Sequence, residues 1–178
     1  MLQTDKTRRT LPSAEEKEAL YRAVREPIEA VVAVDDDLLA AMCSIACILH
    51  HALPHYYWTG FYRRVAEAEL LVGPYQGTLG CLRIPFSQGV CGAAARERAT
   101  QIVPDVRAFP GHIACDAISA SEIVVPVLNA GGELIAVFDV DSDLPAAFDE
   151  TDRRHLEEIV ALLAGKLALP VVATGIRS

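Results

Sequence analysis

Three cysteines between residues 81 and 115 have the side chain that thiol chemistry needs. Cys81 lies in a Gly-Cys-Leu-Arg run, and Cys91 lies in Gly-Val-Cys-Gly at the start of an expected helix. Unpaired N–H groups at a helix start lower the pKa of a thiol, so we expect Cys91 to be more acidic than an ordinary cysteine. Cys115 lies in a long non-periodic segment, 104–121. Loops of this length in a compact domain are commonly functional.

The residue types leave three interpretations of these cysteines open. A zinc site would take all three together with His112, although their spacing lacks the compact pairs of structural zinc motifs. Buried thiols without a reaction are the commonest use of cysteine. A redox site needs an attacking and a resolving thiol, and two candidate partners are available here. Cys43 and Cys47, one turn apart in an apolar segment, are expected to fill the core.

Three carboxylates are expected to meet at one end of a β-hairpin. Strands over 122–128 and 133–141 flank an Asn-Ala-Gly-Gly turn. Centring the turn on that sequence places Glu122 opposite Asp139, with Asp141 on the same face. Such crowding needs a cationic ligand, a metal or a retained proton, unless the strands fray and the carboxylates are solvated. The set lacks the usual loop ligands of Mg²⁺ or Ca²⁺, and we expect no metal.

Helical segments are expected at both ends of the chain. Ser13 and Glu16 have capping-box spacing, so a first helix should run from Ala14 to about Glu26, where Pro27 interrupts or kinks it. A second helix should follow 35–37, and a last one should begin near residue 149. Between them we expect strands at 58–64, 69–75 and 79–86, a short helix at 89–98 and an extended segment at 100–103.

These elements indicate one α+β domain with a central, mostly antiparallel sheet. Both faces of the last hairpin are apolar, so the sheet should be covered on both sides. We expect the N- and C-terminal helices to pack on one face and loops to cover the other.

The composition limits the classes of partner. The formal net charge is −8, whereas nucleic acids and anionic membranes need a basic face. No apolar run approaches the roughly 18 residues of a membrane span. No apolar core follows the basic residues near the N-terminus, as a signal peptide requires. We therefore expect a cytoplasmic protein with reduced cysteines that binds neither nucleic acid nor membrane.

Eight segments of the chain carry recognisable motifs: Trp58–Tyr62, Gly73–Gly77, Arg83–Phe86, Gly89–Gly92, Val103–Val106, Phe109–Asp116, Ser121–Pro126 and Phe138–Ser142. Together they resemble the free methionine-(R)-sulfoxide reductase family, whose fold is a GAF domain. The resemblance covers about residues 14–165, and one departure is an extra residue in the hairpin turn. It implies a single GAF domain over 13–169. We expect the polar N-terminus, 1–12, and the tail, 170–178, to be flexible.

The resemblance implies a role for each motif cysteine. Cys115 matches the attacking cysteine, Cys81 the principal resolving cysteine, and Cys91 a third cysteine that relays the disulfide. The implied reaction converts free methionine-(R)-sulfoxide to methionine through a sulfenic acid and an intramolecular disulfide. Family members use thioredoxin as reductant and are commonly homodimers, so a homodimer is one expectation for this chain. We expect no cofactor.

The resemblance also assigns the polar and aromatic groups. Trp58 matches an aromatic that packs against the methyl-sulfoxide end of the substrate. Glu122, Asp139 and Asp141 match its polar ligands. A carboxyl crowded by two others retains a proton more readily, so Glu122 is the expected acid. The two aspartates would pair with the substrate ammonium.

A second class of function is a GAF module that binds a small ligand or senses redox state without turnover. Such modules usually accompany an output domain, and a chain of 178 residues has little room for one. A sensor also needs no set of three cysteines. A peroxide-sensing thiol protein would use the cysteines but not the carboxylates or Trp58.

Overall fold

The computed structural model describes residues 10–111 and 117–166 of the chain. The expected flexible ends, 1–12 and 170–178, fall mainly or wholly outside these residues. Cys115 and His112 also lie outside the described residues.

Helix α1 spans Ala14–Val32 and begins as its sequence predicts. The Ser13 side chain accepts a hydrogen bond from the Glu16 backbone N–H, and the Glu16 side chain accepts one from the Ser13 N–H. This is the expected capping box. The prediction that the helix ends near Glu26 is wrong, because α1 continues through Pro27 for more than a turn.

The buried face of α1 explains this continuation. Pro27 is exposed, while Tyr21, Val24, Ile28 and Val32 recur at helical spacing and are buried. Burial of Ile28 and Val32, which follow the proline, offsets the roughly 3 kcal/mol that a proline costs inside a helix.

Helix α2 spans Leu38–Ala52, and its first turn is capped by the Asp37 carboxylate, which accepts a hydrogen bond from the Ala40 N–H. Cys43 is exposed and Cys47 is half-buried. The prediction that both cysteines fill the core is therefore wrong. The core-facing stripe of α2 consists of Leu38, Ala41, Met42, Ile45, Ala46 and Leu49.

Six strands form one sheet in which each neighbouring pair is antiparallel. Their order is β3-β2-β1-β6-β5-β4, so β1 and β6 lie in the middle. The strand expected over 79–86 is shorter than predicted, because residues 77–82 form a connecting segment instead. The strands are β1 Trp58–Ala66, β2 Glu69–Gln76, β3 Arg83–Pro85, β4 Gln101–Val103, β5 Ser121–Leu128 and β6 Leu134–Ser142.

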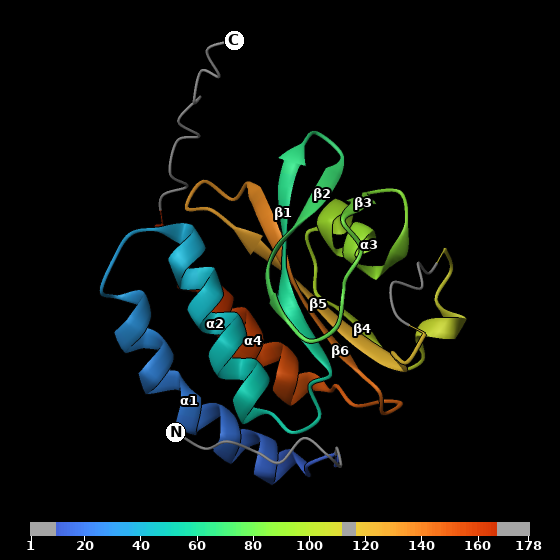
Figure 1. Ribbon diagram of the computed structural model, residues 1–178, viewed down its shortest axis with the longest axis horizontal. Helices are drawn as coiled ribbons and strands as arrows, with labels where there is room; N and C mark the ends of the chain where they lie inside the picture. The colour runs from blue at the N-terminus through green and yellow to red at the C-terminus, as the bar shows by residue number, and fades with distance from the viewer. Residues whose placement is uncertain (1–9, 112–116, 167–178) are drawn as a thin grey trace.

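The sheet is covered on both faces, as predicted (Figure 1). Helices α2 and α4 (Glu150–Ala161) lie on one face, and α1 packs against both of them. Helix α3 (Gly89–Glu97) packs on β5 and β6 from the other face, with the 3₁₀ helix η1 (Val106–Ala108) in the connection that follows β4. The core is therefore divided into two layers by the sheet.

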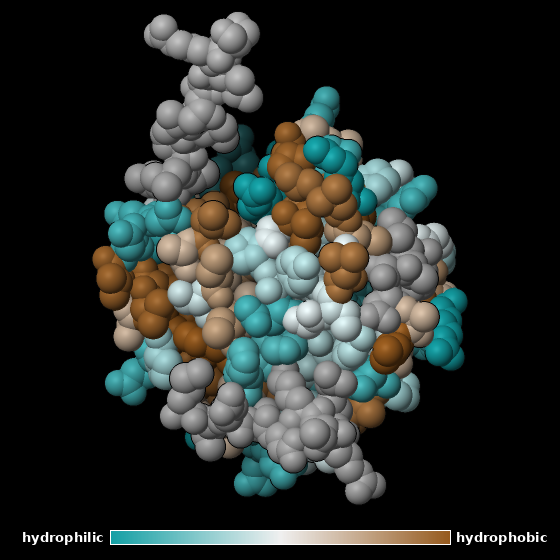
Figure 2. Space-filling model, in the orientation of Figure 1, coloured by the Kyte–Doolittle hydropathy of each residue, from teal (hydrophilic) through white to brown (hydrophobic). Residues whose placement is uncertain are grey.

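The exposed apolar side chains on the surface lie in separate areas. No helix within the described ranges is long and apolar enough to cross a bilayer. Figure 2 shows apolar side chains over the turn between α1 and α2, where Val31 and Val34 are exposed. Other apolar areas on the same face lie apart from it.

Strands β5 and β6 form the predicted hairpin, but the predicted register is wrong by two residues at the carboxylate end. Glu122 lies opposite Asp141, whereas Asp139 lies opposite Val124. A slip of two residues returns every side chain to the same face, whereas a slip of one would reverse it. The three carboxylates therefore share a face despite the different register.

A wider turn causes the difference in register. The Asn129 N–H donates to the Glu133 carbonyl oxygen at 2.9 Å, and the Asn129 side-chain oxygen accepts from the backbone N–H groups of Gly131 and Glu133. Ile135 is then an extra residue, between the pairs Val127–Ala136 and Leu128–Leu134. Such a bulge shifts one strand against the other.

Candidate active site

A row of directly paired residues crosses three strands at one end of the sheet. Trp58 on β1 lies opposite Asp141 on β6, and Asp141 lies opposite Glu122 on β5. In the next row of the same face, Gly60 lies opposite Asp139. Directly opposite residues share a face, as do residues two apart in one strand. The sheet thus brings the four predicted strand residues together.

Helix α3 adds Cys91 to these carboxylates. The Cys91 Sγ atom lies 4.0 Å from Glu122 Oε1. Ligand atoms of Cys91, Glu122 and Asp139 all lie within 4.8 Å of one another. Gly92 lets the start of α3 pack closely on the segment before it, since a Cβ atom there would lie 2.7 Å from the Pro85 carbonyl oxygen.

Glu122 and Asp139 are almost fully buried, at 7% and 5% exposure. Burial raises the pKa of Glu122 well above its ordinary value, and the charges of Asp139 and Asp141 raise it further. Burial also raises the pKa of Asp139, with the charge of Asp141 adding to the effect. A hydrogen bond between the two carboxyls adds to the rise in the pKa of Glu122 and partly offsets the rise in that of Asp139. The prediction that the pKa of Glu122 is raised is confirmed, and burial is the main cause.

Cys91 does not have the acidity that its helix position predicts. Its thiol is 3% exposed, and burial raises its pKa well above the ordinary value. The charges of Asp139 and Glu122 add to the effect. The prediction of a lowered pKa is wrong, because desolvation and nearby negative charge outweigh the helix dipole.

One carboxylate oxygen in the cluster lacks a donor. Asp139 Oδ1 is buried and has no hydrogen-bond partner in the described part of the chain. No ion pair among the described residues involves Asp139 or Glu122. An unsatisfied buried acceptor costs about 1–3 kcal/mol, and more when it is charged. The pocket is therefore suited to a ligand that is cationic and supplies hydrogen-bond donors.

Trp58 forms the apolar wall beside the carboxylates. Its ring stacks between those of Tyr62 and Tyr75, with centroids at 5.6 Å and 5.3 Å. Tyr62 and Tyr75 were not predicted as site residues, although Tyr62 lies four residues after Trp58 and so shares its strand face. Burial raises the pKa of Tyr62 well above its ordinary value, with Asp139 and Cys91 contributing, so its hydroxyl remains protonated.

Cys81 belongs to the segment that packs on this aromatic stack. The Trp58 indole N–H donates to the Thr78 carbonyl oxygen at 3.0 Å. A Cβ atom on Gly80 would lie 2.9 Å from the Tyr62 hydroxyl and 3.1 Å from the Trp58 ring. Glycine is therefore required directly before Cys81 for the segment to lie this close.

The cysteines differ in oxidation state. Cys81 is disulfide-bonded, whereas Cys43, Cys47 and Cys91 are free thiols. A cysteine in a disulfide has no thiolate to offer a metal. The zinc site that would combine Cys81 and Cys91 with Cys115 and His112 is thus incompatible with this state of the protein.

Both flanks of the segment that contains Cys115 are held beside the cluster. The Gly89 N–H, at the start of α3, donates to the Gly111 carbonyl oxygen at 3.0 Å. On the other side, the Ala120 N–H donates to the Ser142 carbonyl oxygen at 2.8 Å, next to the paired Glu122 and Asp141. Residues 112–116, with Cys115, lie between these two anchors and outside the described residues.

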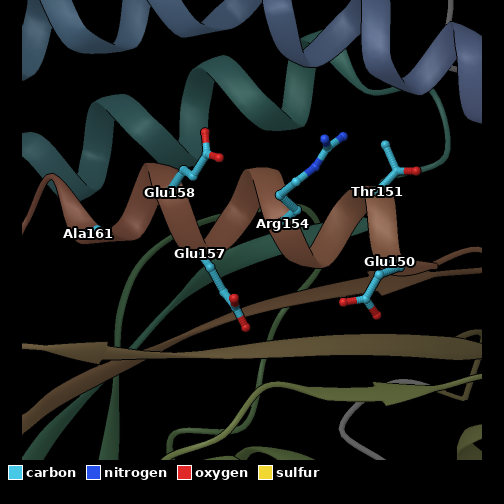
Figure 3. Close-up of a pocket in the computed structure, with 6 residues that line it drawn as sticks. All are labelled: Glu150, Thr151, Arg154, Glu157, Glu158 and Ala161. Atoms are coloured by element: carbon cyan, nitrogen blue, oxygen red, sulfur yellow. The ribbon is translucent and has the colours of Figure 1, made fainter.

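A hollow of about 790 Å³ lies along α4 on the outside of the molecule (Figure 3). Its charges are used in ion pairs, because Arg154 pairs with Glu18 and Glu158 pairs with Arg25. It holds neither a cysteine nor an aromatic ring, so it has no group for redox chemistry. The lining residues are Glu150, Thr151, Arg154, Glu157, Glu158 and Ala161.

Known proteins resemble this chain along most of its length. The GAF domain family matches residues 35–168. Protein YtsP of Bacillus subtilis is 40% identical over 154 residues, which are 86% of this chain and 94% of that protein. The free methionine-R-sulfoxide reductase of Escherichia coli is 37% identical over 152 residues, 85% of this chain and 91% of that enzyme. The X-ray structure of free methionine-R-sulfoxide reductase from Neisseria meningitidis, in complex with its substrate, has a TM-score of 0.80 at 45% identity and covers 88% of this chain and 94% of that one.

Proposed function

Because the chain belongs to the free methionine-R-sulfoxide reductase family of GAF domain proteins, we propose that it reduces free L-methionine-(R)-sulfoxide to L-methionine with its cysteine thiols. The observation that carries this proposal is the buried group of Cys91, Glu122 and Asp139 beside Trp58. It combines a thiol, a proton carrier, a negatively charged pocket and an aromatic wall in one place.

Substrate binding follows from the charges of this pocket. The ammonium group of a free amino acid supplies the cation and the N–H donors that Asp139 lacks, and Asp141 adds a second carboxylate on the same strand face. The methyl group and sulfur at the other end of the substrate are apolar and polarizable, and they suit the face of Trp58. The two ends together fix the orientation of the sulfoxide.

Glu122 is the acid in this scheme. A sulfoxide sulfur becomes electrophilic when its oxygen is protonated or strongly hydrogen-bonded. Burial and the neighbouring aspartates raise the pKa of Glu122, so the carboxyl holds a proton near neutral pH. It can deliver this proton to the sulfoxide oxygen as the sulfur is attacked.

Cys115 is the nucleophile. Its thiol attacks the sulfoxide sulfur, methionine leaves, and the oxygen remains on Cys115 as a sulfenic acid. The Cys81 thiol then attacks that sulfenic acid, which forms the Cys81–Cys115 disulfide and releases water. The disulfide state of Cys81, with Cys43, Cys47 and Cys91 free, supports this pairing, because Cys115 is the cysteine that is left.

Two further steps close the cycle. The free Cys91 thiol can exchange with the Cys81–Cys115 disulfide and relay it. The dithiol of thioredoxin then reduces the disulfide, becomes oxidised in turn, and returns both cysteines to thiols. A GAF module that only senses a ligand would need neither the resolving cysteine nor the buried acid, which is why turnover is the better proposal.

The direct test is methionine release. The reduced protein is incubated with racemic free methionine sulfoxide and dithiothreitol, and methionine and both epimers are quantified by chiral chromatography. We expect methionine to accumulate until the (R) epimer is consumed, with the (S) epimer left. Saturable binding of the sulfoxide without methionine release would indicate a sensor and refute the proposal.

A further inference from the structure

Cys91, Glu122 and Asp139 also have the geometry of a metal site. Their ligand atoms come from α3, β5 and β6 and lie within 4.8 Å of one another. In a tetrahedral zinc site, sulfur and oxygen ligands lie about 3.6 Å apart, given bond lengths of about 2.3 Å and 2.1 Å. The observed 4.0 Å between Cys91 Sγ and Glu122 Oε1 is a few tenths of an ångström longer. Small side-chain movements therefore suffice to bring the three ligands onto one ion.

An independent observation indicates that the cluster attracts a cation. Asp139 is 5% exposed, and its Oδ1 has no hydrogen-bond partner among the described residues. The described residues also provide no ion pair to either carboxylate of the group. A bound cation would supply the contact that Asp139 Oδ1 lacks, and it would replace the proton between the two carboxyls.

The kinds of ligand select the cation. Mg²⁺ and Ca²⁺ need about six or more oxygen ligands, and this group offers two carboxylates and a thiol. Zn²⁺ accepts sulfur and carboxylate oxygen together, and with three protein ligands it keeps a fourth position open. The sequence pattern of the carboxylates does not by itself indicate a zinc site. The contact between Cys91 and Glu122 in the folded protein adds the sulfur ligand that indicates zinc.

We propose that this pocket binds one Zn²⁺ through Cys91, Glu122 and Asp139, and that zinc thereby competes with the substrate. The site differs from one built on the motif cysteines, since it uses neither Cys81 nor Cys115. The zinc site itself does not depend on the reductase activity. The competition rests on the proposed function, in which Asp139 binds the substrate ammonium and Glu122 is the acid. Zinc should then be a reversible inhibitor that a chelator removes.

The test uses the oxidised protein, in which Cys81 is already in its disulfide. A Cys43→Ser/Cys47→Ser background removes the two free thiols of α2, which lie outside the pocket. Calorimetric titration with Zn²⁺ alone should give one ion per chain, and Mg²⁺ should give no saturable binding. Cys91→Ser, which nearly preserves the side-chain volume, should weaken zinc binding at least tenfold.

Glu122→Gln gives a second, independent variant and should also weaken zinc binding at least tenfold. Cooperative thermal unfolding of each variant shows that it is folded. Absence of saturable zinc binding, or binding that is unchanged in Cys91→Ser, would overturn the proposal.

A final titration, with saturating free methionine-(R)-sulfoxide present, separates the two claims. A lower apparent zinc affinity supports competition in one pocket. Zinc binding that depends on Cys91 but is unaffected by the sulfoxide would uphold the metal site and refute the substrate position given under the proposed function.

Discussion

Glu122 and Asp139 have different proposed roles, proton donor and ammonium ligand. One carboxyl group could not fill both roles at the same time. An acid must hold a proton at neutral pH, and a ligand for an ammonium group must be ionised. Burial raises the pKa of both groups, and the hydrogen bond between them adds to the rise for Glu122 and partly offsets it for Asp139. Carboxyl pairs whose environments separate their pKa values commonly divide the acid and anion roles in this way.

The first prediction concerns the proton on Glu122. Glu122→Gln keeps the size of the side chain and its capacity to donate a hydrogen bond, but it has no transferable proton. We expect kcat with dithiothreitol to fall by about 10²- to 10⁴-fold, the usual contribution of an acid, while substrate affinity changes far less. Wild-type turnover in this variant across pH 6–8 would show that Glu122 is not the acid.

The second prediction separates the cysteines by a single turnover. Without reductant, Cys81→Ser should release about one methionine per chain. With thioredoxin it should release no more, because the variant lacks the resolving thiol that acts on the sulfenic acid. Cys115→Ser should release none. Rapid-quench measurement of methionine separates the two variants. Full single-turnover release of methionine by Cys115→Ser would contradict the role of Cys115 as the attacking cysteine. Cys43→Ser, at an exposed position on α2, is the matched control and should cycle normally.

At the scale of elements, strand β1 positions the aromatic wall through a glycine. A Cβ atom on Gly60 would lie 2.3 Å from Tyr75 Cβ and 2.8 Å from the Trp58 ring. Gly60 also lies opposite Asp139. Only glycine allows the indole to lie over this point of the strand.

The third prediction follows from this contact. Gly60→Ala should displace Trp58 or Tyr75, lower kcat/KM at least tenfold and reduce the free energy of unfolding by about 1–3 kcal/mol, as overpacking does. Steady-state kinetics and urea unfolding measure both effects. Gly165→Ala is the control, because a Cβ atom there has no heavy atom within 4 Å. Equal kinetics for the two variants would show that the Trp58 position is unimportant.

The elements were more predictable from the sequence than their limits. Strong apolar periodicity and capping residues locate α1, α2 and α4, since these signals are local. The continuation of α1 through Pro27 depends on what its buried face contacts, and that is a tertiary property. The hairpin register likewise depends on the bulge at Ile135, which the alternation of side chains does not reveal.

The same distinction applies to the site. Face-sharing by Glu122, Asp139 and Asp141 follows from the two-residue period of a strand and tolerates an error of two in register. The contact of Cys91 with these carboxylates depends on how α3 packs on the sheet. The sequence alone predicts a Cys91 pKa lowered by the helix dipole, whereas burial in the folded protein raises it.

At the scale of the whole molecule, the buried carboxyls make the pocket a destabilising feature at neutral pH. The pKa of Glu122 is raised in the folded protein above its ordinary value of about 4.3. The folded state therefore binds this proton more tightly than the unfolded state. The resulting stability is fully present below the ordinary pKa and is lost as the pH rises through the folded-state pKa.

The fourth prediction tests this linkage. Glu122→Gln removes the titration, so its stability relative to the wild type should increase from pH 5 to pH 8, by about 1.4 kcal/mol per pH unit until the folded-state pKa is reached. Urea unfolding at both pH values measures the difference. Glu67→Gln, at an exposed position between β1 and β2, should stay within about 0.5 kcal/mol of the wild type at both. A difference between Glu122→Gln and wild type that is constant or shrinks with pH would contradict the prediction.

The most direct test of the central claim compares free methionine-(R)-sulfoxide with its N-acetyl derivative as substrates for the reduced protein. Acetylation replaces the ammonium group with a neutral amide, which removes the cation proposed to bind Asp139 and Asp141. A site built around a buried polar partner rejects an analogue that lacks it by as much as about 10⁴- to 10⁵-fold. We predict rapid methionine release from the free amino acid and a kcat/KM at least about 10³-fold lower for the acetylated form. Comparable kcat/KM values for the two would contradict the claim that these carboxylates select the free amino acid.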